Sequence, residues 1–188
     1  RNRDLKKRAS AKELCVFNMT TETFPKTDQE IEEQVIKWFL KYHRESIDSF
    51  SGQEEFTLFA KLPIDKQKSL NVLLHDEELI VLVLKKGNAN IVVCTTRRFV
   101  YFENDYIDEL KYSDFETHAG YRSLILPGNT GSSIDVKTDG YICEFGLRKI
   151  DGELVYWKIP TGHSGFAFWN VTKKFSIIGR KYTIPATE

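Results

Sequence analysis

The sequence is poor in cysteine, and its three cysteines lie far apart at Cys15, Cys94 and Cys143. An odd number of widely spaced cysteines fits neither a disulfide framework nor a zinc site, so we expect all three to be reduced. No apolar run reaches the roughly 18 residues that a spanning helix requires. No charged and then apolar leader is visible, although a chain that opens on Arg1 leaves earlier processing open. These features favour a cytoplasmic protein.

An excess of charge of either sign is also missing. Basic and acidic residues number 27 each, so the formal net charge is zero. Without a global positive field the protein is not drawn to nucleic acid, and binding to an anionic bilayer would need a local patch. The sequence therefore predicts no nucleic-acid partner. Residues 1–12 carry six basic side chains and almost no apolar ones, which predicts a solvated, partly extended leader over residues 1–26.

Residues with metal-binding or catalytic spacing are scarce. The four histidines, His43, His75, His118 and His163, are scattered, and none belongs to an H-E-x-x-H-like arrangement. The carboxylates are dispersed, so no two of them can be paired for acid–base work. We therefore expect no metal, no cofactor and no catalytic activity.

Strands dominate the middle of the chain. Three apolar runs, Leu79–Leu84, Ile91–Cys94 and Phe99–Phe102, are β-branched or aromatic and are separated by turn residues. Leu79–Leu84 is apolar at every position, which predicts a strand buried on both faces. We expect one face to line the main core and the other to meet the helix predicted at residues 27–50.

Turn signals and alternation predict further strands beyond residue 102. These lie at Tyr106–Tyr112, Tyr121–Leu126, Ile134–Thr138, Tyr141–Leu147 and Leu154–Ile159. Asp151-Gly152 is typical of the tight turn of a hairpin, because type I′ turns need residues that tolerate positive φ. The strand-rich part then holds about seven strands.

The clearest helix is predicted over Thr27–Phe50. Thr27 and Glu30 have the spacing of a capping box, and Ser51-Gly52 would end the helix. One apolar stripe follows helical spacing through Ile31, Val35, Trp38, Phe39 and Tyr42. Glu33 with Lys37, and Lys41 with Glu45, are expected to form solvated pairs on the opposite face.

Shorter helices are predicted at Gln53–Leu62 and Asp65–Leu74. Residues 27–74 would then form a helical N-terminal part packed on the sheet. Whether that part docks on its own sheet or belongs to an assembly stays open, because an amphipathic stripe serves either arrangement.

Three short motifs mark the strand-rich part. Asp76-Glu77-Glu78 forms an acidic lead-in, Val92–Phe102 reads VVCTTRRFVYF, and Leu110–Phe115 reads LKYSDF. Over roughly residues 75–178 this pattern resembles the bacterial pleckstrin-homology-like (PH-like) domains. The resemblance implies an α+β fold for residues 75–188, with a strongly bent antiparallel sheet or barrel and a C-terminal helix.

The resemblance also decides whether one ambiguous segment is interpreted as a helix or as a strand. Gly165–Ile178 places Phe168, Val171, Phe175 and Ile178 on one helical face, while its composition favours a strand. Because the resemblance implies a C-terminal helix, we predict that this segment is helical. The family implies little about the ligand, because such domains bind lipids, peptides and proteins.

The candidate ligand-binding residues are Lys85, Lys86, Arg97 and Arg98. The resemblance implies basic residues around the first turn in phosphoinositide-binding members, where they hold phosphate. Arg97 and Arg98 point to opposite faces of a strand, so at most one of them serves a given site. Strand curvature could bring Lys86 towards one arginine. The alternative interpretation is exposed lysines and a salt-bridged arginine.

Large aromatic side chains exceed what a small core needs, which predicts an interaction surface. The sequence therefore predicts a non-catalytic binding module that acts through a protein partner. The alternatives are a module that binds phosphoinositide or other anionic lipid headgroups, a calycin-like barrel that carries a small ligand, and an immunity or antitoxin protein. The sequence identifies neither the partner nor the oligomeric state.

Overall fold

The computed structural model describes residues 23–52, 54–72, 74, 78–86, 90–122 and 140–184. Residues 1–22 of the predicted leader, the strand at Ile134–Thr138 and most of the strand at Tyr121–Leu126 lie outside these residues. In the described part, no helix combines the length and the apolar character needed to cross a membrane.

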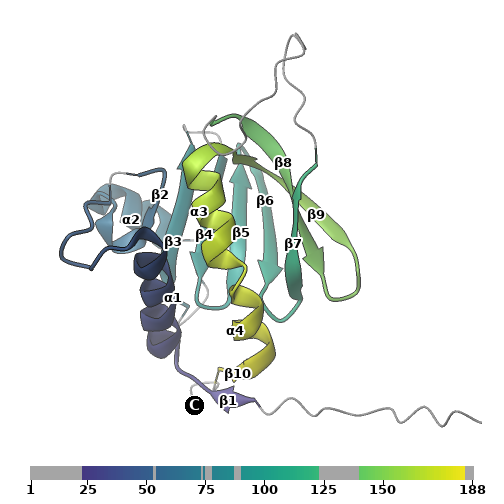
Figure 1. Ribbon diagram of the computed structural model, residues 1–188, viewed down its shortest axis with the longest axis horizontal. Coiled ribbons are helices and arrows are strands. Elements are labelled where there is room, and N and C mark those ends of the chain that lie inside the picture. Colours follow the sequence, from purple (N-terminus) through teal and green to yellow (C-terminus); the bar gives the residue numbers. More distant parts are fainter. Residues whose placement is uncertain are drawn as a thin grey trace, which may run out of the picture.

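The larger sheet is antiparallel and has the strand order β2-β3-β4-β5-β6 (Figure 1). Its strands are β2 (Phe56–Leu58), β3 (Ile80–Lys86), β4 (Asn90–Thr95), β5 (Arg98–Glu103) and β6 (Tyr106–Lys111). All the strands predicted between residues 79 and 112 are confirmed. Their β-branched and aromatic side chains suit a pleated surface, and Asn104 makes the β5–β6 turn with φ of 52°.

The smaller sheet is antiparallel and has the order β7-β8-β9. Its strands are β7 (Phe115–Tyr121), β8 (Ile142–Lys149) and β9 (Leu154–Pro160). The predicted hairpin is confirmed, with Gly152 at φ 90°. The sequence analysis missed most of β7, which begins at Phe115 and ends at Tyr121, where the predicted strand was expected to begin. Two register shifts in the pairing of β7 with β8 interrupt the alternation by which a strand is recognised.

The two sheets pack together without closing into a barrel in the part of the chain that the structure describes. Trp157 of β9 donates its indole N–H to Oδ2 of Asp108 in β6 at 2.8 Å. The same ring stacks on Tyr101 of β5, with centroids 5.4 Å apart. The α+β class with antiparallel sheets is confirmed, whereas the closed form of the expected barrel is not what these residues show.

Helix α1 (Asp28–His43) begins as predicted but ends earlier. The Thr27 side chain accepts from the Glu30 amide, and the Glu30 carboxylate accepts from the Thr27 amide, so the capping box is present. The predicted end at Phe50 was wrong, because Arg44 adopts the left-handed conformation at φ 57° and terminates the helix.

The face of α1 that packs inward carries Ile31, Val35 and Phe39, all fully buried. Trp38 is half-buried and Tyr42 is exposed, so the predicted apolar stripe is narrower than its sequence suggests.

The segment after α1 is a strand rather than the predicted helix at Gln53–Leu62. Phe56–Leu58 forms β2 on the edge of the larger sheet, and a single 3-10 turn, η1 (Phe59–Lys61), follows it. Pairing with β3 buries all three residues of β2, and Phe56 and Thr57 favour a strand over a helix. The next predicted helix is confirmed as α2 (Ile64–Asn71).

Strand β3 is buried on both faces, as predicted. Leu82 and Leu84 face the main core, whereas Val83 faces a second apolar cluster that includes Leu70 of α2. Ile80 joins the second cluster because a register shift lies between Ile80 and Leu82. The expectation that α1 covers the second face was wrong: α1 packs into the main core, and η1 and α2 cover the other side.

Two helices near the C-terminal end complete the main core. They are α3 (Gly162–Thr172) and α4 (Phe175–Lys181), so the predicted helix is confirmed but is divided in two. Figure 1 shows α3 lying across the larger sheet with α1 beside it, and α4 below α3. Two short strands, β1 (Phe24–Pro25) and β10 (Tyr182–Thr183), then pair in parallel and tie the start of the described chain to its end.

Aromatic rings fill the space between the sheets and these helices. Phe99 of β5 stacks on Phe175 of α4 at 5.5 Å and meets Tyr112 edge-on at 4.8 Å. Phe168 of α3 contacts both Phe56 and Phe99. Most of the aromatic surplus noted in the sequence is therefore core packing.

Candidate functional site

The turn between β4 and β5 positions the two predicted arginines. Oγ1 of Thr95 accepts from the backbone N–H groups of Arg97 (3.1 Å) and Arg98 (2.9 Å), which fixes the turn. The phenol of Tyr112, whose pKa burial raises well above its usual value, donates to the Thr95 carbonyl at 2.8 Å. The two arginines pair with different carboxylates, yet both line the same cleft.

Arg97 is paired with the N-terminus of α1. Its Nε and NH2 groups donate to the two carboxylate oxygens of Asp28 at 3.1 and 2.6 Å. Thr96 donates its hydroxyl to the same carboxylate. Asp28 lies in the first turn of α1, where the helix dipole also favours a negative charge. The Arg97 side chain thus fastens α1 to the β4–β5 turn.

Arg98 is paired in the interior. Its NH2 group donates to Oε2 of Glu78 at 3.0 Å and its Nε group to Oε1 at 3.1 Å, while NH1 donates to Glu109. The Arg98 and Glu78 side chains are only 6% and 1% exposed. Because a buried charge that loses its partner is costly, this pair is a structural element of the turn.

The predicted lysines lie at the other end of the larger sheet. Lys86 pairs with Asn90 in the β3–β4 register, while Ile80 pairs with Thr95 at the arginine end. At ~3.3 Å per residue the two ends of β3 are about 20 Å apart, so Lys86 does not approach an arginine. Lys86 instead forms an ion pair with Glu55 at 3.5 Å. The structure therefore does not bring the four predicted residues together.

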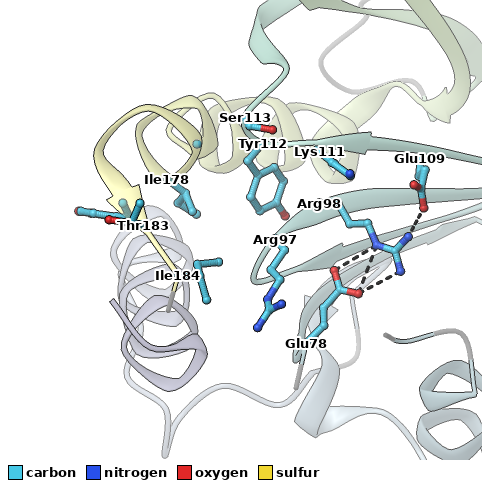
Figure 2. Close-up of a pocket in the computed structure, with 12 residues that line it drawn as sticks. Glu78, Arg97, Arg98, Glu109, Lys111, Tyr112, Ser113, Ile178, Thr183 and Ile184 are labelled. Atoms are coloured by element: carbon cyan, nitrogen blue, oxygen red, sulfur yellow. Dashed lines mark hydrogen bonds and ion pairs between the residues drawn. The ribbon is translucent and has the colours of Figure 1, made fainter. Parts of the chain in front are cut away.

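A cleft opens beside the arginines, and we call it the rim cleft (Figure 2). Its volume is about 490 Å³, and it is lined by Glu78 and by residues 97, 98, 109, 111–113, 178, 179 and 182–184. One wall is the start of β5 with the end of β6, and the opposite wall is α4 with β10. Its size falls in the range of small-ligand and peptide pockets, roughly 300–1,000 Å³.

The two walls of the rim cleft differ chemically. The half-buried Ile184 gives the α4–β10 wall an apolar surface, and the buried Ile178 lies in the same wall, as Figure 2 shows. The β5–β6 wall is polar, but both of its arginines already have carboxylate partners. Lys111 is exposed and forms no ion pair within the described residues. The cleft can thus offer one ammonium group and an apolar wall to a ligand.

Tight backbone packing sets the shape of the cleft. A Cβ atom at Gly179 of α4 would lie 1.8 Å from the Tyr112 carbonyl oxygen. Only glycine lets α4 approach the end of β6 this closely.

The histidines and cysteines of the described residues lie away from the rim cleft. His118 is buried in the core, where desolvation lowers the pKa of its imidazole from 6.5 to about 3. Cys94 and Cys143 are free and buried, and burial raises the pKa of both thiols. No three potential metal-binding side chains cluster among the residues described.

Sequence reasoning pointed to Arg97 and Arg98 but missed the rest of the rim cleft. Lys111 ends β6 and Tyr112 follows it directly, while Ile178 and Ile184 line the cleft from a distant part of the chain. No local motif connects these segments, so only the packing of α4 against β6 reveals them.

Comparison with known proteins gives no relative. No protein-family model, curated protein or solved structure matches this chain. The rim cleft must therefore be interpreted from its own chemistry.

Proposed function

We propose that this protein is a non-catalytic binding module that holds an extended segment of a partner protein in the rim cleft. The observation that carries this proposal is the pairing of an apolar wall with the ammonium group of Lys111, which has no ion pair among the described residues. A peptide with one apolar and one acidic side chain matches both walls.

The position of Lys111 supports an extended peptide. Lys111 belongs to β6, which is an edge strand of the larger sheet. An edge strand leaves one row of backbone donors and acceptors unpaired, and a peptide can add to that row as a further strand. Backbone pairing would supply affinity, and the cleft would select the side chains.

The charges of the rim cleft favour a carboxylate over a phosphorylated headgroup. Glu78 and Glu109 line the same cleft, and they would repel a ligand that carries several negative charges. Lys85 and Lys86, the expected phosphate-binding lysines, lie at the far end of β3. A calycin-like carrier is also disfavoured, because aromatic rings occupy the space between the sheets.

The element order supports a PH-like fold for this module. Strands β3 to β9 follow one another along the chain and are succeeded by α3 and α4. That is the order implied by the resemblance of residues 75–178, and we propose membership of this class on that basis. The free, buried thiols of Cys94 and Cys143 support action in a reducing compartment, the cytoplasm.

Selection from a displayed library of short random peptides tests the proposal. Peptides retained by the parent protein should combine an acidic residue with an apolar one. Lys111→Glu should weaken their binding about tenfold, since it replaces an attraction by a repulsion. Lys68→Glu, an equal charge change on the exposed face of α2, is the matched control and should leave binding unchanged.

Ile184→Ala tests the apolar wall. Removing its methyl groups from the contact should also weaken binding by several-fold, at about 0.8 kcal/mol per buried methylene. Thermal unfolding of each variant checks that the fold persists. Selected peptides that bind the Lys111→Glu and Lys68→Glu proteins equally well would contradict the proposal.

A further inference from the structure

A second hollow lies along α1. It has a volume of about 540 Å³ and is lined by residues 26, 30, 33, 34, 37, 38, 41 and 174, and we call it the lysine groove. Tyr182 is shared by the two sites: it lines the rim cleft, and its hydroxyl donates to Gln34 of the lysine groove at 3.2 Å.

Positive charge predominates in this groove. Four lysines line it against two glutamates. One of these, Glu30, is engaged in the capping box, where its carboxylate accepts from the Thr27 amide at 2.8 Å. The whole chain is neutral, so an excess of lysines in a concave surface is a local feature and not a consequence of composition.

Two of the lysines hold fixed positions through the groove walls. Lys26 donates to Gln34, and its ammonium group lies 4.3 Å from the centre of the Tyr182 ring. Lys174 lies 5.7 Å from the centre of the Trp38 ring. Contact with aromatic faces holds a cation in place without neutralising it.

The other two lysines, Lys37 and Lys41, lie one turn apart on α1 and are exposed. Their expected partners were Glu33 and Glu45, but neither pair comes within ion-pair distance in the structure, and the described residues give them no other carboxylate. The groove therefore presents a row of ammonium groups that are available to a ligand.

From this arrangement we infer that the lysine groove binds an acidic segment of a protein, with carboxylates spaced to meet Lys37, Lys41 and Lys174. A concave groove fits a linear chain, whereas a flat bilayer would meet the rims of the groove first. The half-buried Trp38 ring adds an apolar contact for the stem of a glutamate or for a neighbouring apolar residue. This inference concerns a different site and does not depend on the rim cleft.

Fluorescence anisotropy of a labelled oligoglutamate peptide tests the inference. The peptide should bind the full chain at low ionic strength and dissociate as salt increases, because exposed charges are screened. Lys37→Glu combined with Lys41→Glu should weaken binding at least about tenfold, because two contacts are lost and two repulsive charges are added. The matched control is Lys66→Glu with Lys68→Glu on α2, which makes the same change in net charge away from the groove.

A neighbouring pair of lysines tests the geometry of the groove. Lys174 lines it, whereas Lys173 is exposed beside it and donates to Asn170. Lys174→Glu should weaken oligoglutamate binding several-fold, and Lys173→Glu should have a much smaller effect. Thermal unfolding verifies that each variant is folded.

Three results would overturn the inference. The first is no binding by the parent protein at low salt. The second is an equal loss in the groove variant and in the α2 control, which would show a general charge attraction. The third is binding to phosphatidylserine vesicles but not to oligoglutamate, with sensitivity to Lys37 and Lys41, which would make a bilayer the ligand. Lys37→Glu with Lys41→Glu should leave binding of the library-selected peptides at the rim cleft unchanged, since neither residue lines that cleft, so failure here is separate from failure at the rim cleft.

Discussion

His118 should make the fold sensitive to mildly acidic pH. Its ring is buried in β7 among Phe115 and Phe145, with ring centres at 5.0 and 5.2 Å. Oγ1 of Thr172 donates to the Phe168 carbonyl at 2.7 Å, so it must accept from Nε2 of His118, which lies 3.1 Å away. This assigns the neutral tautomer with the proton on Nε2. Nδ1 is buried without a partner, and a proton there would have no acceptor.

The size of the effect follows from the pKa of the imidazole, which burial lowers from 6.5 in the unfolded chain to about 3 in the fold. Between these values the unfolded chain binds a proton that the folded protein does not, so stability is complete above pH 6.5 and falls as the pH decreases towards 3. At about 1.36 kcal/mol per unit, the free energy of unfolding should drop by about 2 kcal/mol between pH 7.5 and pH 5.

Urea unfolding followed by tryptophan fluorescence measures this loss in the parent and in His118→Phe. The variant keeps an aromatic ring at the position but cannot take up a proton, so its stability should change about 2 kcal/mol less over the same pH interval. The other histidines and the carboxylates titrate in both proteins, and their effects cancel in the comparison. Parallel pH profiles for the two proteins would refute the reasoning, whatever their absolute stabilities.

Further predictions concern the packing around the rim cleft and the start of α1. Glu78→Ala leaves Arg98 buried without its main partner and should lower the free energy of unfolding, measured with urea, by about 3–5 kcal/mol. Glu116→Ala is the control: it breaks an exposed ion pair with Arg148 at 3.9 Å and should leave the free energy of unfolding nearly unchanged. Gly179→Ala places a methyl group against the Tyr112 carbonyl and should lower the free energy of unfolding by about 1–3 kcal/mol, which a thermal unfolding curve measures. An unchanged midpoint temperature would show that α4 can move away freely. Thr27→Ala removes the N-cap of α1 and should cost about 1 kcal/mol, measurable as a lower urea midpoint; no shift would mean that the cap adds nothing to the stability of α1.

Strands in the centre of the sheet could be predicted because their local signals agree with their environment. The run from Leu79 to Leu84 is apolar at each position, and the structure covers both of its faces. The capping box at Thr27 is likewise a local signal, and its two hydrogen bonds are present. In these segments propensity, pattern and tertiary packing point to the same structure.

The secondary-structure predictions failed where contacts with distant parts of the chain decide the local structure. Phe56–Leu58 becomes a strand because β3 offers an edge to pair with, and nothing in those three residues indicates that edge. The end of α1 at Arg44 depends on a left-handed residue that is not glycine, so the usual signal is missing. In β7, register shifts in the pairing with β8 interrupt the alternation of buried and exposed side chains, so the strand lacks its usual sequence pattern.

The candidate site was only partly accessible from sequence for the same reason. Two adjacent arginines suggested a binding site, but Asp28 and Glu78, which neutralise them, come from separate parts of the chain. Lys111 gave no signal, because a single lysine in an edge strand resembles any solvated position. Its significance depends on the apolar wall that α4 and β10 place opposite it.

A map of amide chemical shifts, recorded while a library-selected peptide is added to the ¹⁵N-labelled protein, tests the central claim most directly. If the rim cleft holds the peptide, the perturbed amides should concentrate at Lys111–Ser113 and at Ile178–Ile184, with little change at Lys85 and Lys86. Perturbations that gather at those two lysines instead, or that leave both walls of the rim cleft untouched, would contradict the account.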